Sequence, residues 1–588
     1  MASSHCHASP NLFDRLPDDV VLLILFAAHV MCLRRYPYSQ TGYAIPLGHV
    51  CHRWRVIVLN YSMFWNDLVV PDNLEVFRTL LKRSKLSPLS LSAHTSGPHK
   101  LSRVARGRNA LAEESESDSE WEGCEPGPIQ FALEEVLYKD EQRVRVQELD
   151  LSLCRDEFKK VLRALGLRPE IAEQEFNQEE RRVSATGVSL PWPILKSLCL
   201  ETVDWSPTTN LPIRLLENLP KLSYLRLKDC PPVSDAAYAR PQCFPAVKKL
   251  MLYDLTLKLS VLETLGTSLE VLELQGIRLD GITYRAPCRA VFAETPWTIS
   301  GYSLYNVPLE DPPPYNPKEH VVLSNLKTLV IDGRILARAI PILAALRLPL
   351  LCLVSVKVEV CCMGDKTVEE WLELTELARQ IRHRIQDGTP VEHLLISVKR
   401  DFKQPQICLF GFDAQRSERM RIYLIGSMSG FREPSFSPMI EEYASLMCST
   451  IPVHLLTSLK LCMDWLEKPG CSSKPARLAY ALQGSGLKKL EVCTVESQYL
   501  EDVLLVWPHG DSERLLESGI AVFPALEKLV LVQVRFSTRL DADTKRLADI
   551  LSRAAPSLEI LRLSRCEGIP EGAVARLSGS AKFLIVEP

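Results

Sequence analysis

One six-residue pattern recurs along most of this chain and constrains its fold more than any other feature. The pattern reads hydrophobic-x-x-Leu-x-hydrophobic, where x is usually polar. Such alternation is typical of a β-strand with one buried face. The pattern begins at eleven positions: Val146, Leu195, Leu222, Val247, Leu269, Leu326, Val391, Leu456, Leu487, Leu526 and Leu558. Because one short strand cannot bury its apolar face alone, we expect the units to stack.

The spacing of the patterns indicates a repeat. It is 27, 25 and 22 residues in the first cluster and 31, 39 and 32 residues near the C-terminus. A period of about 20–29 residues with this consensus is the signature of a leucine-rich repeat. In five units a proline stands two residues before the pattern, where it ends a helix and turns the chain into the strand: Pro193, Pro220, Pro245, Pro524 and Pro556.

These features predict an α/β fold in which an irregular leucine-rich-repeat solenoid, or horseshoe, occupies residues 129–588. Insertions at about 280–320 and 360–450 interrupt it, and the second is expected to hold a helix near 368–386. The polar positions of each strand face outward and could hold a partner protein, although such charges often only solvate a face. The candidates are Tyr224, Arg226, Lys248, Lys249, Glu270, Glu273, Lys488, Lys489, Glu527, Lys528 and Arg562.

The first seventy residues carry a different pattern. Leu16-Pro17-Asp18-Asp19 precedes a run of apolar residues, and this order favours a helix that begins after Pro17. Apolar residues lie all round this helix, so it must be covered on more than one side. A second helix is predicted from about His49. The segment is too small to stand alone without a neighbouring domain or a partner.

The blocks "LPDDVVLLIL", "HVCHRWRVIVLN" and "MFWNDL" over residues 12–70 resemble an F-box, and the whole chain resembles the F-box/leucine-rich-repeat family, in particular fungal-type F-box domain-containing proteins. One departure is the stretch 27–48, which is longer than usual. The resemblance implies docking to the SKP adaptor of cullin-RING ubiquitin ligases. By position, the residues implied in adaptor binding are Leu16, Pro17, Ile24, Val50, Cys51 and Trp54. The alternative is that they form the core of a helical cap on the solenoid.

Three cysteines follow the repeat pattern: Cys154, Cys230 and Cys566. They resemble the cysteine-containing repeats of the same family, in which the thiol caps backbone groups in a turn and the next helix begins at an acidic residue. Asp235 and Glu571 occupy those positions here. We therefore expect core thiols and no redox or metal groups at these three positions.

The remaining segments are interpreted as leader and linkers. Residues 1–11 are predicted to be a disordered leader, 71–91 a linker with a helix and a strand, and 92–128 a disordered acidic linker. In that linker Ser115, Ser117 and Ser119 each have an acidic residue three places on, which suits an acid-directed kinase. A solvated loop is the simpler interpretation. Pro312, Pro313 and Tyr315 match the Pro-Pro-x-Tyr form that WW domains bind, or they belong to a stiff loop.

Composition excludes several classes of function. The net charge of -3 argues against a nucleic-acid-binding protein. None of the 18 cysteines forms a Cys-x-x-Cys pair, so no finger-type metal site is expected. The longest apolar stretch, Val20 to Leu33, has 14 residues, fewer than a membrane span needs. No phosphate loop, zinc-protease motif or nucleophile elbow is present, so we expect neither enzymatic activity nor a cofactor.

The sequence thus predicts the substrate-recognition subunit of an SKP–cullin–F-box ubiquitin ligase in the cytoplasm, the nucleus or both. The F-box would bind the adaptor and the solenoid would bind an unknown substrate protein. The alternative is a leucine-rich-repeat scaffold unconnected to ubiquitin. A hydrolase or transferase on an α/β frame has little support.

Overall fold

The computed structural model describes residues 15–35, 44–70, 73–94, 128–137, 139–153, 192–202, 219–229, 247–280, 320–333, 336–361, 367–386, 391–400, 405–427, 455–463, 486–493, 523–536, 541–569 and 572–588. The chain has 588 residues and divides into two compact units, Met1–Thr256 and Leu257–Pro588. Each unit mixes helices with a largely parallel sheet, so the predicted α/β class with a small helical region at the N-terminus is confirmed.

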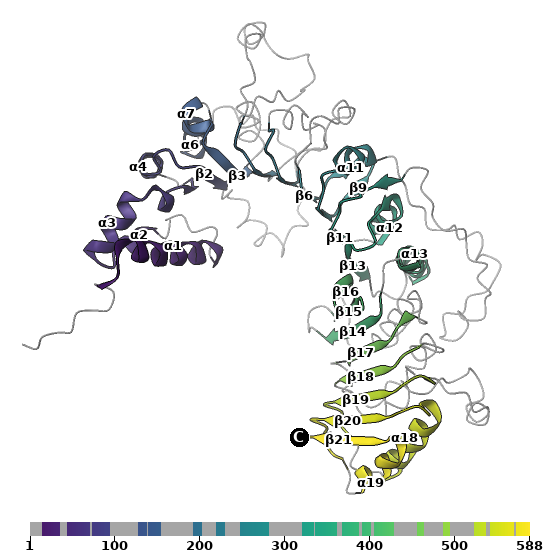
Figure 1. Cartoon of the computed structure of the whole chain (residues 1–588). Helices are drawn as coiled ribbons and strands as arrows, with labels where there is room; N and C mark the ends of the chain where they lie inside the picture. Colours follow the sequence, from purple (N-terminus) through teal and green to yellow (C-terminus); the bar gives the residue numbers. More distant parts are fainter. Residues whose placement is uncertain are drawn as a thin grey trace, which may run out of the picture. The chain divides into compact units, whose positions relative to one another are not determined.

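Unit 1 opens with the helical region (Figure 1). Its helices are α1 (Asp18–Arg35), α2 (Ala44–Gly48), α3 (His52–Asn60), the 3-10 turn η2 (Ser62–Phe64), α4 (Leu74–Arg83), α6 (Pro128–Leu137) and α7 (Asp140–Arg143). Helix α1 begins directly after Pro17 with Asp18 and Asp19 in its first turn, as the sequence predicts. The second predicted helix is α3, which begins three residues later than expected.

Six parallel strands follow one another in unit 1. They are β1 (Asp67–Val69), β2 (Leu89–His94), β3 (Val146–Leu153), β4 (Ser197–Thr202), β5 (Tyr224–Lys228) and β6 (Lys249–Tyr253). Each strand pairs with the next in chain order. The sheet therefore starts at β1, inside the F-box-like segment, and β2 lies in the segment interpreted as a linker.

Unit 2 contains a longer ladder, which Figure 1 shows with α18 and α19 lying beside its last strands. Its strands are β8 (Val271–Gln275), β11 (Thr328–Asp332), β13 (Leu353–Cys361), β14 (His393–Arg400), β15 (Pro405–Phe412), β16 (Glu418–Ser427), β17 (Ser458–Met463), β18 (Lys489–Cys493), β19 (Lys528–Val532), β20 (Ile560–Ser564) and β21 (Phe583–Glu587).

The helices of unit 2 are α11 (Leu259–Leu265), α12 (Leu336–Ala345), α13 (Thr367–Gln386), α18 (Asp541–Ala554), α19 (Ala573–Leu577) and the 3-10 turn η7 (Ser578–Ser580). Helix α13 confirms the helix predicted near 368–386. Two-residue strands also occur: β7 (Thr256–Leu257), β9 (Arg278–Leu279), β10 (Val321–Val322) and β12 (Leu346–Arg347). Strand β10 pairs with β12.

All eleven sequence patterns lie on the strands described above, and their pattern leucines are buried. Leu198, Leu225 and Leu250, which stand at matching register positions in β4, β5 and β6, are at most 2% exposed. The prolines Pro193, Pro220, Pro524 and Pro556 lie in turns before their strands, as predicted, and Pro245 lies outside the described residues.

A left-handed residue ends several strands and gives the repeat a second regular feature. Residues Asp229, Asp254, Gly276, Gln533 and Arg565 directly follow β5, β6, β8, β19 and β20 with φ between 52° and 63°. In four of these five turns the amide of this residue donates to the carbonyl of the last residue of the neighbouring strand, as Gln533 N does to Ser564 O at 2.9 Å. The turn thus extends the ladder by one hydrogen bond after each strand ends.

One block of unit 2 departs from the repeat. The spatial order of the strands is β13, β16, β15, β14, β17. After β13, the chain therefore first forms β14, which lies next to β17, and then returns through β15 to β16, which lies next to β13. Strand β15 is antiparallel to both of its neighbours, whereas β16 and β14 are parallel to β13 and β17. Part of the predicted insertion at 360–450 is therefore a three-strand meander built into the sheet.

The turn between β15 and β16 is held by the buried Asp413. Its carboxylate accepts hydrogen bonds from Ser417 N at 2.8 Å, Gln415 N at 3.0 Å and Arg419 Nη2 at 2.7 Å. Burial raises the pKa of this carboxyl, but these donors outweigh burial and hold the pKa below its ordinary value. The charged Asp413 therefore fixes the point at which the ladder reverses.

Several predictions lie outside the described residues. These are the leader 1–11, most of the acidic linker with Ser115, Ser117 and Ser119, most of the insertion at 280–320, and the pair Cys154 and Cys230. In the part of the chain that the structure does describe, no helix is both long and apolar enough to cross a bilayer.

Candidate functional site

The helices α1, α2 and α3 form a small module with its own core. Val21, Leu25 and Val58 are 1% exposed, and Phe64 and Trp65 from the η2 turn are 2% and 3% exposed. Aromatic edges close this core, since the Phe26 and Phe64 rings meet edge to face at 6.1 Å. The Trp65 indole donates from Nε1 to Val58 O at 2.8 Å. The Trp that closes the F-box-like pattern is thus an internal anchor.

Polar contacts fix the two long helices of this module to each other. The Arg53 guanidinium on α3 donates from Nε to Asp18 Oδ1 at 2.8 Å, and it also donates to the carbonyl of Leu16. The Cys51 thiol caps α3 by accepting from Trp54 N at 3.5 Å. The residues before α1 and before α3, two of the three sequence blocks, are therefore held together at one end of the module.

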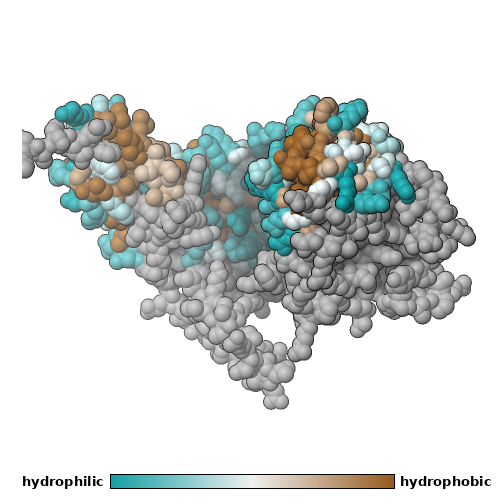
Figure 2. Space-filling view, turned by 90° about the horizontal axis from the view of Figure 1, so that it is seen from below, coloured by the Kyte–Doolittle hydropathy of each residue, from teal (hydrophilic) through white to brown (hydrophobic). Residues whose placement is uncertain are grey.

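The outer surface of the module is apolar and accessible. Leu23 is 68% exposed, Met31 72% and Val50 60%. We call this surface the α1–α3 patch, and its large members are Val20, Leu23, Ile24, Met31, Val50, Val56, Leu59 and Tyr61. Figure 2 shows a hydrophobic area over these N-terminal helices at the left of the view. A contiguous exposed apolar surface of this kind marks a site of protein or membrane contact.

The six residues implied by the F-box resemblance all remain accessible. Pro17, Ile24, Val50 and Cys51 are exposed, while Leu16 and Trp54 are half-buried. Sequence matching missed Leu23, Met31 and Leu59, which are exposed beside them. The signal that could have found Leu23 and Met31 is the apolar composition of α1 on all of its sides, because one small module cannot cover every side of such a helix.

A buried histidine lies where this module meets the first strand. His29 is 1% exposed, its Nε2 is 3.9 Å from Asp67 Oδ2, and its ring packs against Phe64 at 5.6 Å. Neither ring nitrogen has a hydrogen-bond partner within the described residues. Burial lowers the pKa of His29. Burial, followed by the nearby Glu148 charge, raises the pKa of Asp67 to about 6.

A second accessible surface lies on the outward face of β5 and β6. The Arg226 guanidinium lies 5.1 Å from the centre of the Tyr253 ring, and Lys249 Nζ lies 5.1 Å from the centre of the Tyr224 ring. The Tyr224 hydroxyl donates to Met251 Sδ at 3.0 Å. We call these five residues the strand-face cluster. Cation–π contacts of this type hold the side chains in a fixed arrangement.

The side of the cluster next to β4 is partly shielded from solvent. Burial, more than any neighbouring charge, raises the pKa of the Cys199 thiol to about 11 and of Tyr224 to about 12. Burial also raises the pKa of Asp150 on β3. The thiol and the phenol are therefore neutral at physiological pH, and they offer hydrogen-bonding groups without charge beside the two cationic side chains.

Several of the other outward candidates form ion pairs with neighbouring strands. Lys327 contacts Glu270 at 2.6 Å, Lys488 contacts Glu527 at 3.3 Å, and Arg562 contacts Glu587 at 2.5 Å. All candidates predicted to face outward are exposed or half-buried: Tyr224, Arg226, Lys248, Lys249, Glu270, Glu273, Lys488, Lys489, Glu527, Lys528 and Arg562. Among these candidates, Arg226 and Lys249 of the strand-face cluster are cations that contact an aromatic ring.

Cys566 can be compared with its predicted role as a turn cap. Its thiol donates to Leu531 O at 3.5 Å and to Ser564 O at 3.6 Å, and burial raises its pKa. The thiol thus donates to backbone carbonyls of β19 and β20, and it is half-buried where the sequence predicts a core thiol. Glu571, Asp235, Pro312, Pro313 and Tyr315 lie outside the described residues. Within those residues, no cluster of three or more His, Cys, Asp or Glu side chains is placed to hold a metal ion.

Comparison with known proteins adds no identification. No model of a known protein family matches the chain, and no curated protein matches its sequence. The two surfaces above are therefore interpreted from their own chemistry.

Proposed function

We propose that this protein is the substrate-recognition subunit of an SKP–cullin–F-box ubiquitin ligase. In this proposal the α1–α3 module is an F-box that binds the SKP adaptor, and the strands behind it are irregular leucine-rich repeats that bind a substrate protein. The observation that carries the proposal is the α1–α3 patch, where Leu23, Met31 and Val50 are 60–72% exposed although the core beneath them is complete.

Some of the F-box-like residues are buried and others are exposed, and this difference supports the assignment. Trp65 and Phe64 are buried and hold the module together, whereas Ile24 and Val50 contribute little to its core. An apolar side chain that is not needed for folding is available for a partner, and such side chains at the centre of an interface carry most of the binding free energy. The alternative of a bare cap on the repeats gives these exposed side chains no partner.

The strand-face cluster suits the substrate side of the proposal. Tyr, Met and Arg are the residue types enriched in protein interfaces. Tyr224, Arg226 and Tyr253 are half-buried and held by mutual contacts, so they lose little conformational entropy on binding. No catalytic group is required of this chain, because ubiquitin transfer takes place on other subunits and the receptor contributes proximity.

The test is adaptor binding by a paired variant, Ile24→Asp with Val50→Asp. Both changes place a charge on the exposed patch without altering the buried core, so the fold is expected to survive. If each side chain contributes about 2 kcal/mol, adaptor affinity falls on the order of 1,000-fold in a titration with purified adaptor.

Leu86→Asp is the matched control. Leu86 is 88% exposed in the same unit but lies after α4, outside the patch, and its substitution should leave adaptor affinity unchanged. Circular dichroism verifies that both variants fold. A wild-type chain that folds but shows no affinity for the adaptor contradicts the proposal and favours a repeat scaffold unconnected to ubiquitin.

A further inference from the structure

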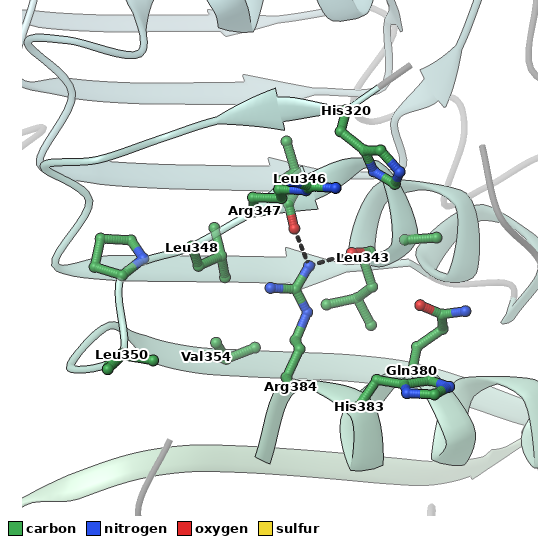
Figure 3. Close-up of a pocket in the computed structure, with 12 residues that line it drawn as sticks. His320, Leu343, Leu346, Arg347, Leu348, Leu350, Val354, Gln380, His383 and Arg384 are labelled. Carbon is green, nitrogen blue, oxygen red and sulfur yellow. Dashed lines mark hydrogen bonds between the residues drawn. The ribbon is translucent and has the colours of Figure 1, made fainter. Parts of the chain in front are cut away.

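A pocket in unit 2 lies between α12, β12, the start of β13 and α13 (Figure 3). Its volume is about 510 Å³, which falls within the range of roughly 300–1,000 Å³ that is usual for small-molecule sites. The pocket belongs to neither of the two surfaces described above. It is lined by the turn from β12 to β13 and by the C-terminal turn of α13.

The polar lining of this pocket is basic. Two arginines and two histidines contribute to it, namely His320, Arg347, His383 and Arg384, and none of the described residues that line it is a carboxylate. Arg347 and His383 are exposed, and neither side chain forms a hydrogen bond or ion pair within the described residues. Such a set of side chains favours an anion, because two guanidinium charges and several hydrogen-bond donors line the same pocket.

One of the basic residues also fixes the shape of the pocket. Arg384 on α13 donates from Nη2 to the carbonyls of Leu343 and Leu346, which end α12 and begin β12 (Figure 3). Beside it, the buried Gln380 donates to Glu376 Oε1 at 2.8 Å. The floor is thereby held in place before any ligand enters, which reduces the entropic cost of binding.

The apolar part of the lining is aliphatic. Leu343 and Leu346 are buried at the base, while Leu348, Leu350 and Val354 line the side next to the turn. None of the described lining residues is Phe, Tyr or Trp. A flexible aliphatic chain fits such walls by van der Waals contact, whereas a planar ring finds no stacking partner.

We propose that this pocket binds an amphipathic anion that has an aliphatic chain and a carboxylate or phosphate head. The chain lies against Leu346, Leu348 and Val354, and the head lies toward Arg347 and His383. This site is independent of adaptor docking, so its success or failure leaves the proposed function untouched.

Four probes separate the contributions of head and chain to binding by the full-length protein. Octanoate and octyl phosphate carry both parts, octan-1-ol lacks the charge, and acetate lacks the chain. Ligand-observed NMR titration is expected to give octanoate a dissociation constant on the order of 1 mM, in keeping with the modest free energy per atom of small ligands. Octanol and acetate should bind at least about 10-fold more weakly, and a preference for octyl phosphate over octanoate identifies phosphate as the head.

Variants locate the binding. Arg347→Gln removes a charge and His383→Gln removes an imidazole from the pocket without touching Arg384, and each should weaken octanoate binding at least about 5-fold. Arg382→Gln is the matched control, because Arg382 is exposed on the same helix next to His383 but does not line the pocket. Equal weakening by Arg382→Gln overturns the proposal, as does octanol binding as tightly as octanoate. Absence of octanoate and octyl phosphate binding up to about 20 mM also overturns it.

Discussion

His29 is the residue whose environment is most at odds with its chemistry. Two ring nitrogens are buried without hydrogen bonds, and each such atom costs about 1–3 kcal/mol when left unsatisfied. We expect His29→Leu to increase the free energy of unfolding by about 1 kcal/mol at pH 7, because it replaces these atoms with apolar ones of similar volume.

The pH dependence of this variant follows from the direction of the pKa shift. Since burial lowers the pKa of His29 in the folded chain, the unfolded chain binds protons more readily, and wild-type stability is lost as pH falls below about 6.5. Asp67 acts in the opposite sense: with its pKa raised to about 6, it contributes stability as pH falls from 6 toward 4. In urea titrations, the difference in free energy of unfolding between His29→Leu and the wild type should therefore increase from pH 7 to pH 5. If this difference decreases instead, protonated His29 gains more free energy from Asp67 than it loses by burial.

The left-handed turn residues provide a second prediction at this scale. Gly276 ends β8 with φ of 63°, a conformation that costs a residue with a side chain about 1–2 kcal/mol. Gly276→Ala should therefore lower the free energy of unfolding by about 1 kcal/mol in denaturant titrations. Gly579→Ala is the control, because a methyl group there meets no atom within 4 Å, and it should change stability by less than about 0.5 kcal/mol.

At the scale of elements, how deeply a strand leucine is buried depends on the place of its strand in the ladder. Leu490 in β18 is flanked by β17 and β19 and is fully buried, whereas Leu584 in β21 pairs with β20 alone and is half-buried. Leu490→Ala should cost about 2–4 kcal/mol, and Leu584→Ala less than about 1 kcal/mol. Equal losses in denaturant titrations would show that β21 is covered as fully as the inner strands.

Adaptor docking also predicts a change in the reactivity of one thiol. Cys51 is exposed at the start of α3 inside the predicted docking surface, whereas Cys199 and Cys352 are buried. We expect iodoacetamide to label Cys51 rapidly in the free chain and much more slowly in the presence of adaptor, as measured by mass spectrometry. Labelling of Cys51 that is unaffected by adaptor would place the contact elsewhere on the module.

The sequence predicts those strands whose pattern is local and complete. Strand β21 follows the same pattern in "AKFLIV", but Ala581 replaces the first large hydrophobe, so the unit was missed. Strand β13 was missed because Val354 stands at the register position that Leu329 occupies in β11. The exposed residues of the α1–α3 module could be predicted only in part. Helix α1 is apolar on all sides, so its sequence does not show which side packs against the rest of the module.

At the scale of the whole molecule, the proposed function predicts that its two surfaces can be removed separately. Tyr224→Ala with Tyr253→Ala should abolish substrate capture while leaving adaptor affinity intact, since neither residue is part of the α1–α3 module. Affinity purification followed by mass spectrometry should then recover the adaptor without the proteins that accompany the wild type. If a folded variant loses both the adaptor and the substrates, the α1–α3 patch and the strand-face cluster do not bind their partners independently.

The reversed block of unit 2 has a consequence for how the chain reaches its native state. A ladder that grows one neighbouring strand at a time can form by sequential addition. The meander prevents this order of addition, because the strand that pairs with β13 is β16, and β14, which directly follows β13 in the chain, pairs with β17 instead. The late strands can therefore assemble on a nucleus of their own before the early ones arrive, and closure of the two halves around β15 becomes the slow, non-local step of folding.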